Sequence, residues 1–190
     1  MKFIFVILLL CAACKSIDNK IDSNEGKMKE ETLKVLKSKE GIQFIHQNFS
    51  ASCFNKTWEF IEKEQLSDED KENMIATSYS SLWHWKQRED CTEQNLSVAY
   101  WQLGKVHCLA GKADTAIEFG WKCLNVSNSL DAFYKGYAYE VLTNAAILQN
   151  DFTEAKKYLS LAVTELEKVA DKENKGYLHK DLEILKKKIP

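Results

Sequence analysis

Proline and glycine are scarce in this sequence. Its 190 residues include seven glycines and a single proline, which is the last residue. Because both residue types are common in tight turns, their scarcity argues against a fold built of many short strands. Leucine, alanine, lysine and glutamate, which favour helices, are abundant instead. The composition therefore predicts an all-α fold.

A surplus of positive charge is also absent. The formal net charge is −2, with both signs interspersed along the chain, which argues against a nucleic-acid groove and a polybasic membrane patch. Zinc-site spacings are missing as well, since the sequence has no His-Glu-x-x-His and no Cys-x-x-Cys. We therefore expect no nucleic-acid partner, no metal, no cofactor and no enzymatic activity.

The longest apolar run lies at the amino terminus. Residues 1–13 carry one early lysine and then an apolar stretch that ends in two alanines before Cys14. The run is too short to span a hydrocarbon layer of about 30 Å as a lasting helix, which indicates an export signal. The alternative is a buried N-terminal helix. Ala12-Ala13-Cys14 resembles a bacterial lipobox, although Cys11 stands where that pattern prefers leucine.

This resemblance implies a lipoprotein-type signal peptide over residues 1–13 and lipidation of Cys14. Residues 14–27 are polar and have too little apolar surface to fold, so we expect a flexible tether there. The protein would then be anchored to the bacterial cell envelope by its own lipid chains. The residues after Cys14, Lys15 and Ser16, favour the outer membrane, on its periplasmic side or surface.

A short pattern recurs through the rest of the chain. An alanine is followed three places later by an aromatic residue at intervals of 40 and 39 residues, in the pairs Ala76 and Tyr79, Ala116 and Phe119, and Ala155 and Tyr158. A nearly constant period of this size indicates stacked helical hairpins. The alternative is an irregular helical bundle in which alanines recur by chance.

The central hairpin, residues 99–124, shows the pattern best. Gly111 is placed to end its first helix, and Gly104 lies inside that helix, where a glycine is tolerated if a second helix crosses closely. Leu103-Gly104, Gly111, Ala116-Ile117 and Leu124 resemble the motif of the tetratricopeptide repeat family. The family's period is about 34 residues and is shorter than the one found here. In the next hairpin, Thr143 replaces the small residue that Gly104 provides.

The resemblance implies stacked antiparallel helical hairpins, about three pairs, with capping helices at both ends. We expect N-terminal capping helices at residues 28–49 and the repeat domain at residues 50–190, closed by a helix over residues 177–189. Before the central hairpin, the sequence predicts a helix over residues 55–65 and another that Ser67 caps, with Asp70 completing a capping box.

In such stacks, the first helix of each hairpin lines the inner surface. Carried over to this chain, the resemblance places Trp101 and Lys105 on one inner helix and Glu140 and Asn144 on the next. It implies a groove that binds an envelope protein or peptide. The alternative from the residues themselves is that Lys105 pairs with Glu140 and that Trp101 belongs to the core.

Two other functions stay open. One is a small-ligand-binding or enzymatic helical domain with an aromatic-lined pocket near His84 and Trp101, and the other is a purely structural envelope protein.

The cysteines of the repeat domain are considered as buried thiols or as disulfide partners. Cys108 and Cys123 are predicted to be buried thiols because the hairpin geometry keeps them about 13 Å apart. A bridge between Cys53 and Cys91 is left open.

Overall fold

The computed structural model describes residues 23–190, and their side chains from residue 28 onwards. The predicted signal peptide at residues 1–13 and the lipidation site Cys14 lie outside the described residues. Most of the predicted tether lies outside them too. Its last part, residues 23–27, belongs to the first described helix, α2 (Ser23–Lys37).

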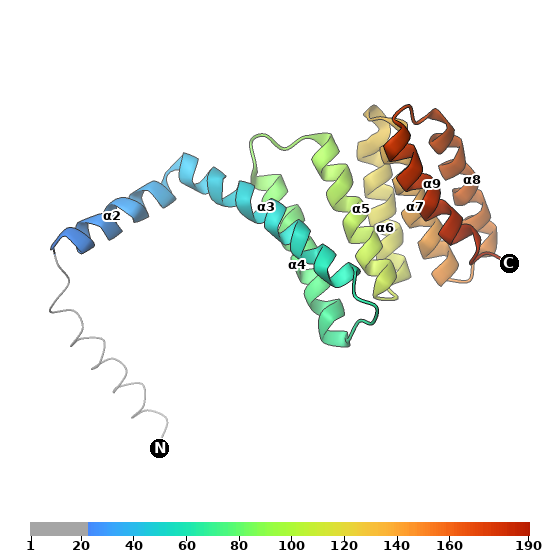
Figure 1. The fold of residues 1–190 in the computed structure, drawn as a ribbon, viewed down its shortest axis with the longest axis horizontal. Helices are drawn as coiled ribbons and strands as arrows, with labels where there is room; N and C mark the ends of the chain where they lie inside the picture. Colours follow the sequence, from blue (N-terminus) through green and yellow to red (C-terminus); the bar gives the residue numbers. More distant parts are fainter. Residues whose placement is uncertain (1–22) are drawn as a thin grey trace, which may run out of the picture. The chain divides into compact units, whose positions relative to one another are not determined.

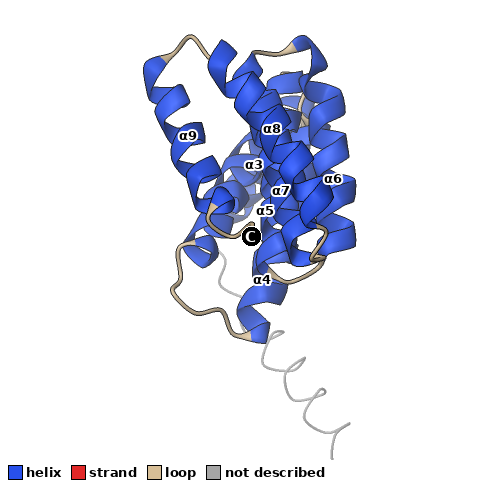
Figure 2. Ribbon diagram, turned by 90° about the vertical axis from the view of Figure 1, so that its right-hand side faces the viewer, coloured by secondary structure: helices blue, strands red, loops and turns tan. Residues whose placement is uncertain are grey.

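The described part of the chain is helical throughout, which confirms the predicted all-α fold. Figures 1 and 2 show helices joined by loops, with no strand between residues 23 and 190. The elements that follow α2 are α3 (Lys39–Ile61), α4 (Asp68–Gln87), α5 (Glu93–Leu109), α6 (Ala113–Val126), the 3-10 turn η2 (Ser127–Ser129), α7 (Ala132–Leu148), α8 (Phe152–Lys168) and α9 (Lys172–Lys186).

The chain divides into two units, and the second, His46–Pro190, contains the stacked hairpins. The helices α5 and α6 form one hairpin and α7 and α8 form the next, while α9 packs against both α7 and α8. The central helix α7 contacts α5, α6, α8 and α9, and Figure 2 shows α6 and α9 on opposite sides of it. The architecture is therefore all-α and resembles that of a helical repeat. The capping role expected for residues 28–49 stays a prediction.

Local signals in the sequence set the helix ends. Ser67 caps α4 in a reciprocal capping box with Asp70, as the sequence predicts. Thr92 and Asn95 form a second such box at the start of α5. Gly111 has a φ of 73°, the left-handed conformation that the sequence predicts for the residue ending this helix.

The predicted close approach at Gly104 is present. A Cβ atom on Gly104 would lie 2.4 Å from Cγ1 of Val141, so a larger residue at this position would require Val141 or one of the helices α5 and α7 to shift. Gly120 on α6 faces the same part of α7, where an added Cβ would lie 2.7 Å from Cδ2 of Leu142. Glycines on two neighbouring helices therefore make room for one pair of apolar side chains on α7.

The recurring alanines are buried in two of the three repeats. Ala116 and Ala155 are fully buried. Ala76 is exposed, so the pattern does not identify the buried face of α4. The sequence pattern predicts that Met74, Ile75, Tyr79, Leu82 and Trp83 form the core stripe of that helix. It packs instead through Met74, Ser78, Ser81 and Leu82, while Tyr79 and Trp83 are 42% and 55% exposed. The buried serines bond to neighbours, as when Ser81 Oγ donates to the carbonyl of Ser50.

The helix α3 is longer than the sequence predicts. It runs without a break through residues 50–54, which separate the expected capping segment from the helix predicted at residues 55–65. Small polar side chains inside it bond to the preceding turn: Ser50 Oγ donates to the carbonyl of Gln47, and Thr57 Oγ1 to that of Cys53. With their hydroxyls satisfied in this way, these buried residues continue the helix.

Candidate functional site

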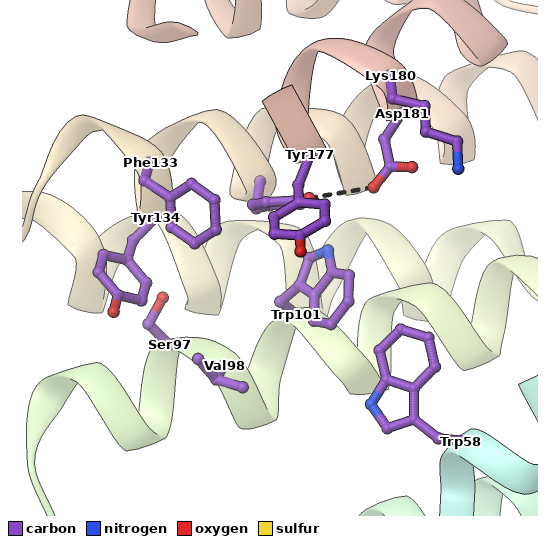
Figure 3. A pocket seen from close by; sticks show the side chains of 10 residues that line it. Trp58, Ser97, Val98, Trp101, Phe133, Tyr134, Tyr177, Lys180 and Asp181 are labelled. Atoms are coloured by element: carbon purple, nitrogen blue, oxygen red, sulfur yellow. Dashed lines mark hydrogen bonds between the residues drawn. The ribbon is translucent and has the colours of Figure 1, made fainter. Parts of the chain in front are cut away.

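The described residues contain a cleft of about 380 Å³ on the side formed by the first helices of successive hairpins. Figure 3 shows side chains from α5, α7 and α9 that point towards this space, with Trp58 of α3 at its edge. Six of the ten lining residues are aromatic. The lining consists of Trp58, Ser97, Val98, Trp101, Phe133, Tyr134, Tyr137, Tyr177, Lys180 and Asp181.

Trp101 occupies the centre of this aromatic lining. Its ring centroid lies 5.8 Å from that of Trp58 and 5.2 Å from that of Tyr137, the latter in an edge-to-face arrangement. Its indole Nε1 donates a hydrogen bond of 3.1 Å to Oε2 of Glu140 on α7. The ring is therefore held by neighbours on α3 and α7 while one part of it borders the cleft.

Glu140 lies behind Trp101. The side chain is buried, with 3% of the residue exposed, and burial raises the pKa of its carboxyl although the nearby Lys105 charge and the Trp101 hydrogen bond oppose this shift. The Lys105 ammonium lies 5.3 Å from the centroid of the Trp101 ring. Glu140 is thus placed to orient Trp101 and does not itself line the cleft.

The helix α9 forms the opposite wall. Tyr137 of α7 donates a hydrogen bond of 3.1 Å to Oδ2 of Asp181, and burial and this carboxylate both raise the pKa of Tyr137. Tyr177, one turn before Asp181, is 54% exposed and borders the cleft. At the end towards the start of α5, the amide of Gln94 donates to the hydroxyl of Tyr134. The polar groups of the wall are therefore partly engaged with one another.

The predicted site residues occupy different places. Trp101 lines the cleft, Glu140 supports it from behind, and Lys105 approaches its ring. Asn144 is half-buried one turn after Glu140 and is not among the cleft-lining residues. Of the ten residues that line the cleft, only Trp101 is predicted as a site residue from the sequence. Aromatic residues on the first helix of a hairpin, such as Phe133 and Tyr137, are the signal in the sequence that points to more of this lining.

The alternative pocket near His84 and Trp101 is not a single space. Trp85 lines a second, smaller cleft of about 190 Å³, which shares Val98 with the aromatic cleft. His84 lines neither of these clefts, and its Nδ1 lies 2.9 Å from Nδ1 of His46. An aromatic cleft therefore exists next to Trp101, without His84.

His107 is a packing residue. Only 4% of it is exposed, and its ring stacks on Phe119 with a centroid distance of 5.6 Å. The Tyr79 hydroxyl lies 3.3 Å from Nε2, while Nδ1 has no hydrogen-bond partner among the described residues. Burial lowers the pKa of His107.

The cysteines in the described part are free thiols. Cys108 and Cys123 are buried, as predicted, and burial raises the pKa of Cys108 to about 12. Cys53 and Cys91 are half-buried and unbridged.

Between residues 23 and 190, no group of three or more His, Cys, Asp and Glu side chains is placed to hold a metal ion. The helices of the same region include none with the length and apolar character that crossing a membrane requires.

A comparison with family models, curated proteins and solved structures finds no match to this chain.

Proposed function

We propose that this protein is a non-enzymatic binding module, a tetratricopeptide-like scaffold that holds a segment of an envelope protein or a peptide in the aromatic cleft. The observation that carries the proposal is the position of the cleft. Its walls come from α3, α5 and α7, the first helices of three successive hairpins, and from α9. In tetratricopeptide-like stacks, the first helices of the hairpins line the inner surface, which is the surface that binds ligands.

The chemistry of the cleft supports a protein ligand. Tryptophan and tyrosine are the residues that contribute most to binding at protein interfaces, because they bury a large area and carry a polar tip. The volume of about 380 Å³ falls at the lower end of the range for ligand pockets and suits one or two large side chains. We therefore expect a ligand segment that inserts an apolar or aromatic anchor.

The test is a selection of peptides from a displayed library on the purified protein, followed by affinity measurements on variants. Tyr177→Ala and Trp58→Ala each remove a ring from the wall, and each should weaken the selected peptide by about 2 kcal/mol, or roughly thirtyfold. Trp121→Ala is the matched control, since Trp121 is 47% exposed on α6 and lies outside the cleft.

If the selected peptides bind Tyr177→Ala and Trp58→Ala as tightly as they bind the wild type, the cleft is not the binding site and the proposal is contradicted. Trp101→Ala is a poor first choice, because it leaves the buried Glu140 without its hydrogen-bond donor and endangers the fold. Trp101→Phe has the same defect, because phenylalanine has no N–H to donate to Glu140.

The second candidate function is the binding of a small organic ligand. It is favoured by the wall that α9 adds, which places Lys180 and Asp181 at the rim of an otherwise apolar cleft. If this alternative holds, the library yields no peptide whose binding is weakened by the cleft variants. The wild type instead binds a fluorescent hydrophobic probe, and the Tyr177→Ala variant binds the probe more weakly.

The proposal includes attachment of the protein to the bacterial cell envelope by lipid on Cys14. It is supported by the Ala12-Ala13-Cys14 junction that follows an apolar run. In cells fed a radioactive fatty acid, the wild type should take up label and Cys14→Ser should not, because the sulfur atom is the attachment point. Label that persists in Cys14→Ser would contradict lipidation at this residue. An outer-membrane position would be tested by fractionation of the labelled membranes.

A further inference from the structure

Two histidines outside the cleft face each other. Nδ1 of His46 on α3 lies 2.9 Å from Nδ1 of His84 on α4, and both side chains are half-buried. We propose that this pair is a binding site for a divalent transition-metal ion that favours tetragonal coordination, of the Ni²⁺ or Cu²⁺ type. The site is independent of the aromatic cleft and of the function proposed for it.

The spacing of the two nitrogens selects the class of ion. Two imidazole nitrogens at about 2.0 Å from a shared metal lie about 2.8 Å apart when they subtend about 90°, and about 3.3 Å apart at the tetrahedral angle. The observed 2.9 Å fits neighbouring positions of a square-planar or octahedral ion. The tetrahedral geometry that zinc prefers requires the two rings to move apart.

The rings are held in place by aromatic neighbours. Phe49 stacks on His84 with a centroid distance of 5.2 Å, and Trp83 contacts His84 edge-on at 4.8 Å. Trp83 also lies 5.3 Å from the ring of His46. These contacts restrict the rotation of both imidazoles. A metal ion would bind both Nδ1 atoms once the proton of their hydrogen bond is carried on Nε2 of the same ring.

The surroundings leave room for other ligands. Phe49 and Trp83 are 51% and 55% exposed, so the pair lies near the surface, and water would complete the coordination. Two neutral nitrogen donors suit Ni²⁺ and Cu²⁺, whereas Mg²⁺ and Ca²⁺ require oxygen ligands.

The experiment is calorimetric titration of the untagged full-length protein with NiCl₂ in detergent near neutral pH. Ni²⁺ is the preferred probe because it does not oxidise the free cysteines. We expect one binding event that is weakened at least about tenfold in His46→Ala and in His84→Ala, since even groups that only support metal ligands contribute that much. His179→Ala is the control, because His179 is exposed on α9.

A structural role for the pair predicts a different result. His84→Gln keeps a side chain that can hydrogen-bond to His46, so it should preserve the fold and still lose the Ni²⁺ event. Ni²⁺ should also raise the melting temperature of the wild type and of His179→Ala, but not that of His84→Gln. If the wild type shows no event, or if the event survives in both His46→Ala and His84→Gln, the pair is only a hydrogen bond and the proposal is overturned.

Discussion

Gly104 shows how one residue sets the distance between two helices. Its missing Cβ leaves space for Val141, which is 1% exposed. Valine is branched at Cβ and has few rotamers in a helix, so it cannot turn away from an added methyl group. The cost of a glycine inside α5 is therefore offset by the packing of α7 against it.

Gly104→Ala should lower the free energy of unfolding by about 1–3 kcal/mol, because the new methyl group overpacks a filled site. The matched control is Gly176→Ala on α9, where nothing lies within 4 Å of the added Cβ. There the better helix propensity of alanine should raise stability by about 0.5–1 kcal/mol. Urea denaturation of both variants measures the difference, and equal effects of the two substitutions would contradict the close crossing.

The sequence predicts such residues when a single local rule applies. Gly111 and Ser67 follow from turn and capping chemistry, and Gly104 from its cost inside a helix. The burial of Glu140 was not predictable in this way, because a carboxylate on the first helix of a hairpin was expected to face a groove. Its partner, the indole of Trp101, lies 39 positions away in the sequence and only the fold brings them together.

At the scale of elements, the sequence predicts α9 better than α3. The periodicity of α3 is weak because polar residues such as Ser50 and Thr57 are buried within it, so the sequence divides one helix into two. In α9, Leu178, Leu182 and Leu185 form a regular apolar stripe, a pattern that predicts their burial, and all three are buried. A helix whose buried face is apolar is readable from sequence, whereas one whose buried face is polar is not.

The helix α9 should depend on Leu178 for its position. This side chain is fully buried and approaches α7 where Gly136 lacks a Cβ. Leu178→Ala should cost about 2–5 kcal/mol of stability and should also weaken peptide binding, because α9 carries Tyr177 and Asp181 into the cleft. Ile184→Ala, on the same helix and 47% exposed, is the control and should change neither quantity much. Thermal unfolding together with peptide affinity would check this, and a Leu178→Ala variant with both unchanged would contradict the docking of α9.

At the scale of the whole molecule, the sequence predicts the class of fold better than the site. The repeated alanines and the scarcity of proline and glycine are sufficient for an all-α stack. The aromatic cleft, in contrast, is assembled from residues between Trp58 and Asp181 on four helices. Their convergence depends on how the helices pack, which no local pattern contains. Trp101 was identified because it lies on the best-conforming hairpin, whereas Tyr177 on the closing helix was not.

Buried titratable groups should make the stability of the whole molecule depend on pH in two opposing ways. His107 and His84 have pKa values below the ordinary 6.5, so the unfolded chain binds more protons than the folded one and stability falls as the pH drops below about 6.5. Glu140 has a pKa above the ordinary 4.5, so the folded chain binds more protons and stability falls as the pH rises above about 4.5. Between these values the two contributions act in opposite directions.

Glu140→Gln should separate the contribution of Glu140 to the pH dependence of stability from that of the two histidines. Glutamine can still accept the hydrogen bond from Trp101 but carries no charge to bury, so at about pH 7.5 the variant should unfold at a higher urea concentration than the wild type. On acidification to about pH 5.5, it should lose more stability than the wild type, because the histidine contribution is no longer offset by protonation of Glu140. Urea denaturation at both pH values, monitored by far-UV circular dichroism, measures the two differences.

The control for loss of a carboxylate at the surface is Glu72→Gln, at an exposed position on α4. A Glu140→Gln variant that is less stable than the wild type at about pH 7.5 would mean that the charged carboxylate stabilises the fold through Lys105 by more than its burial costs.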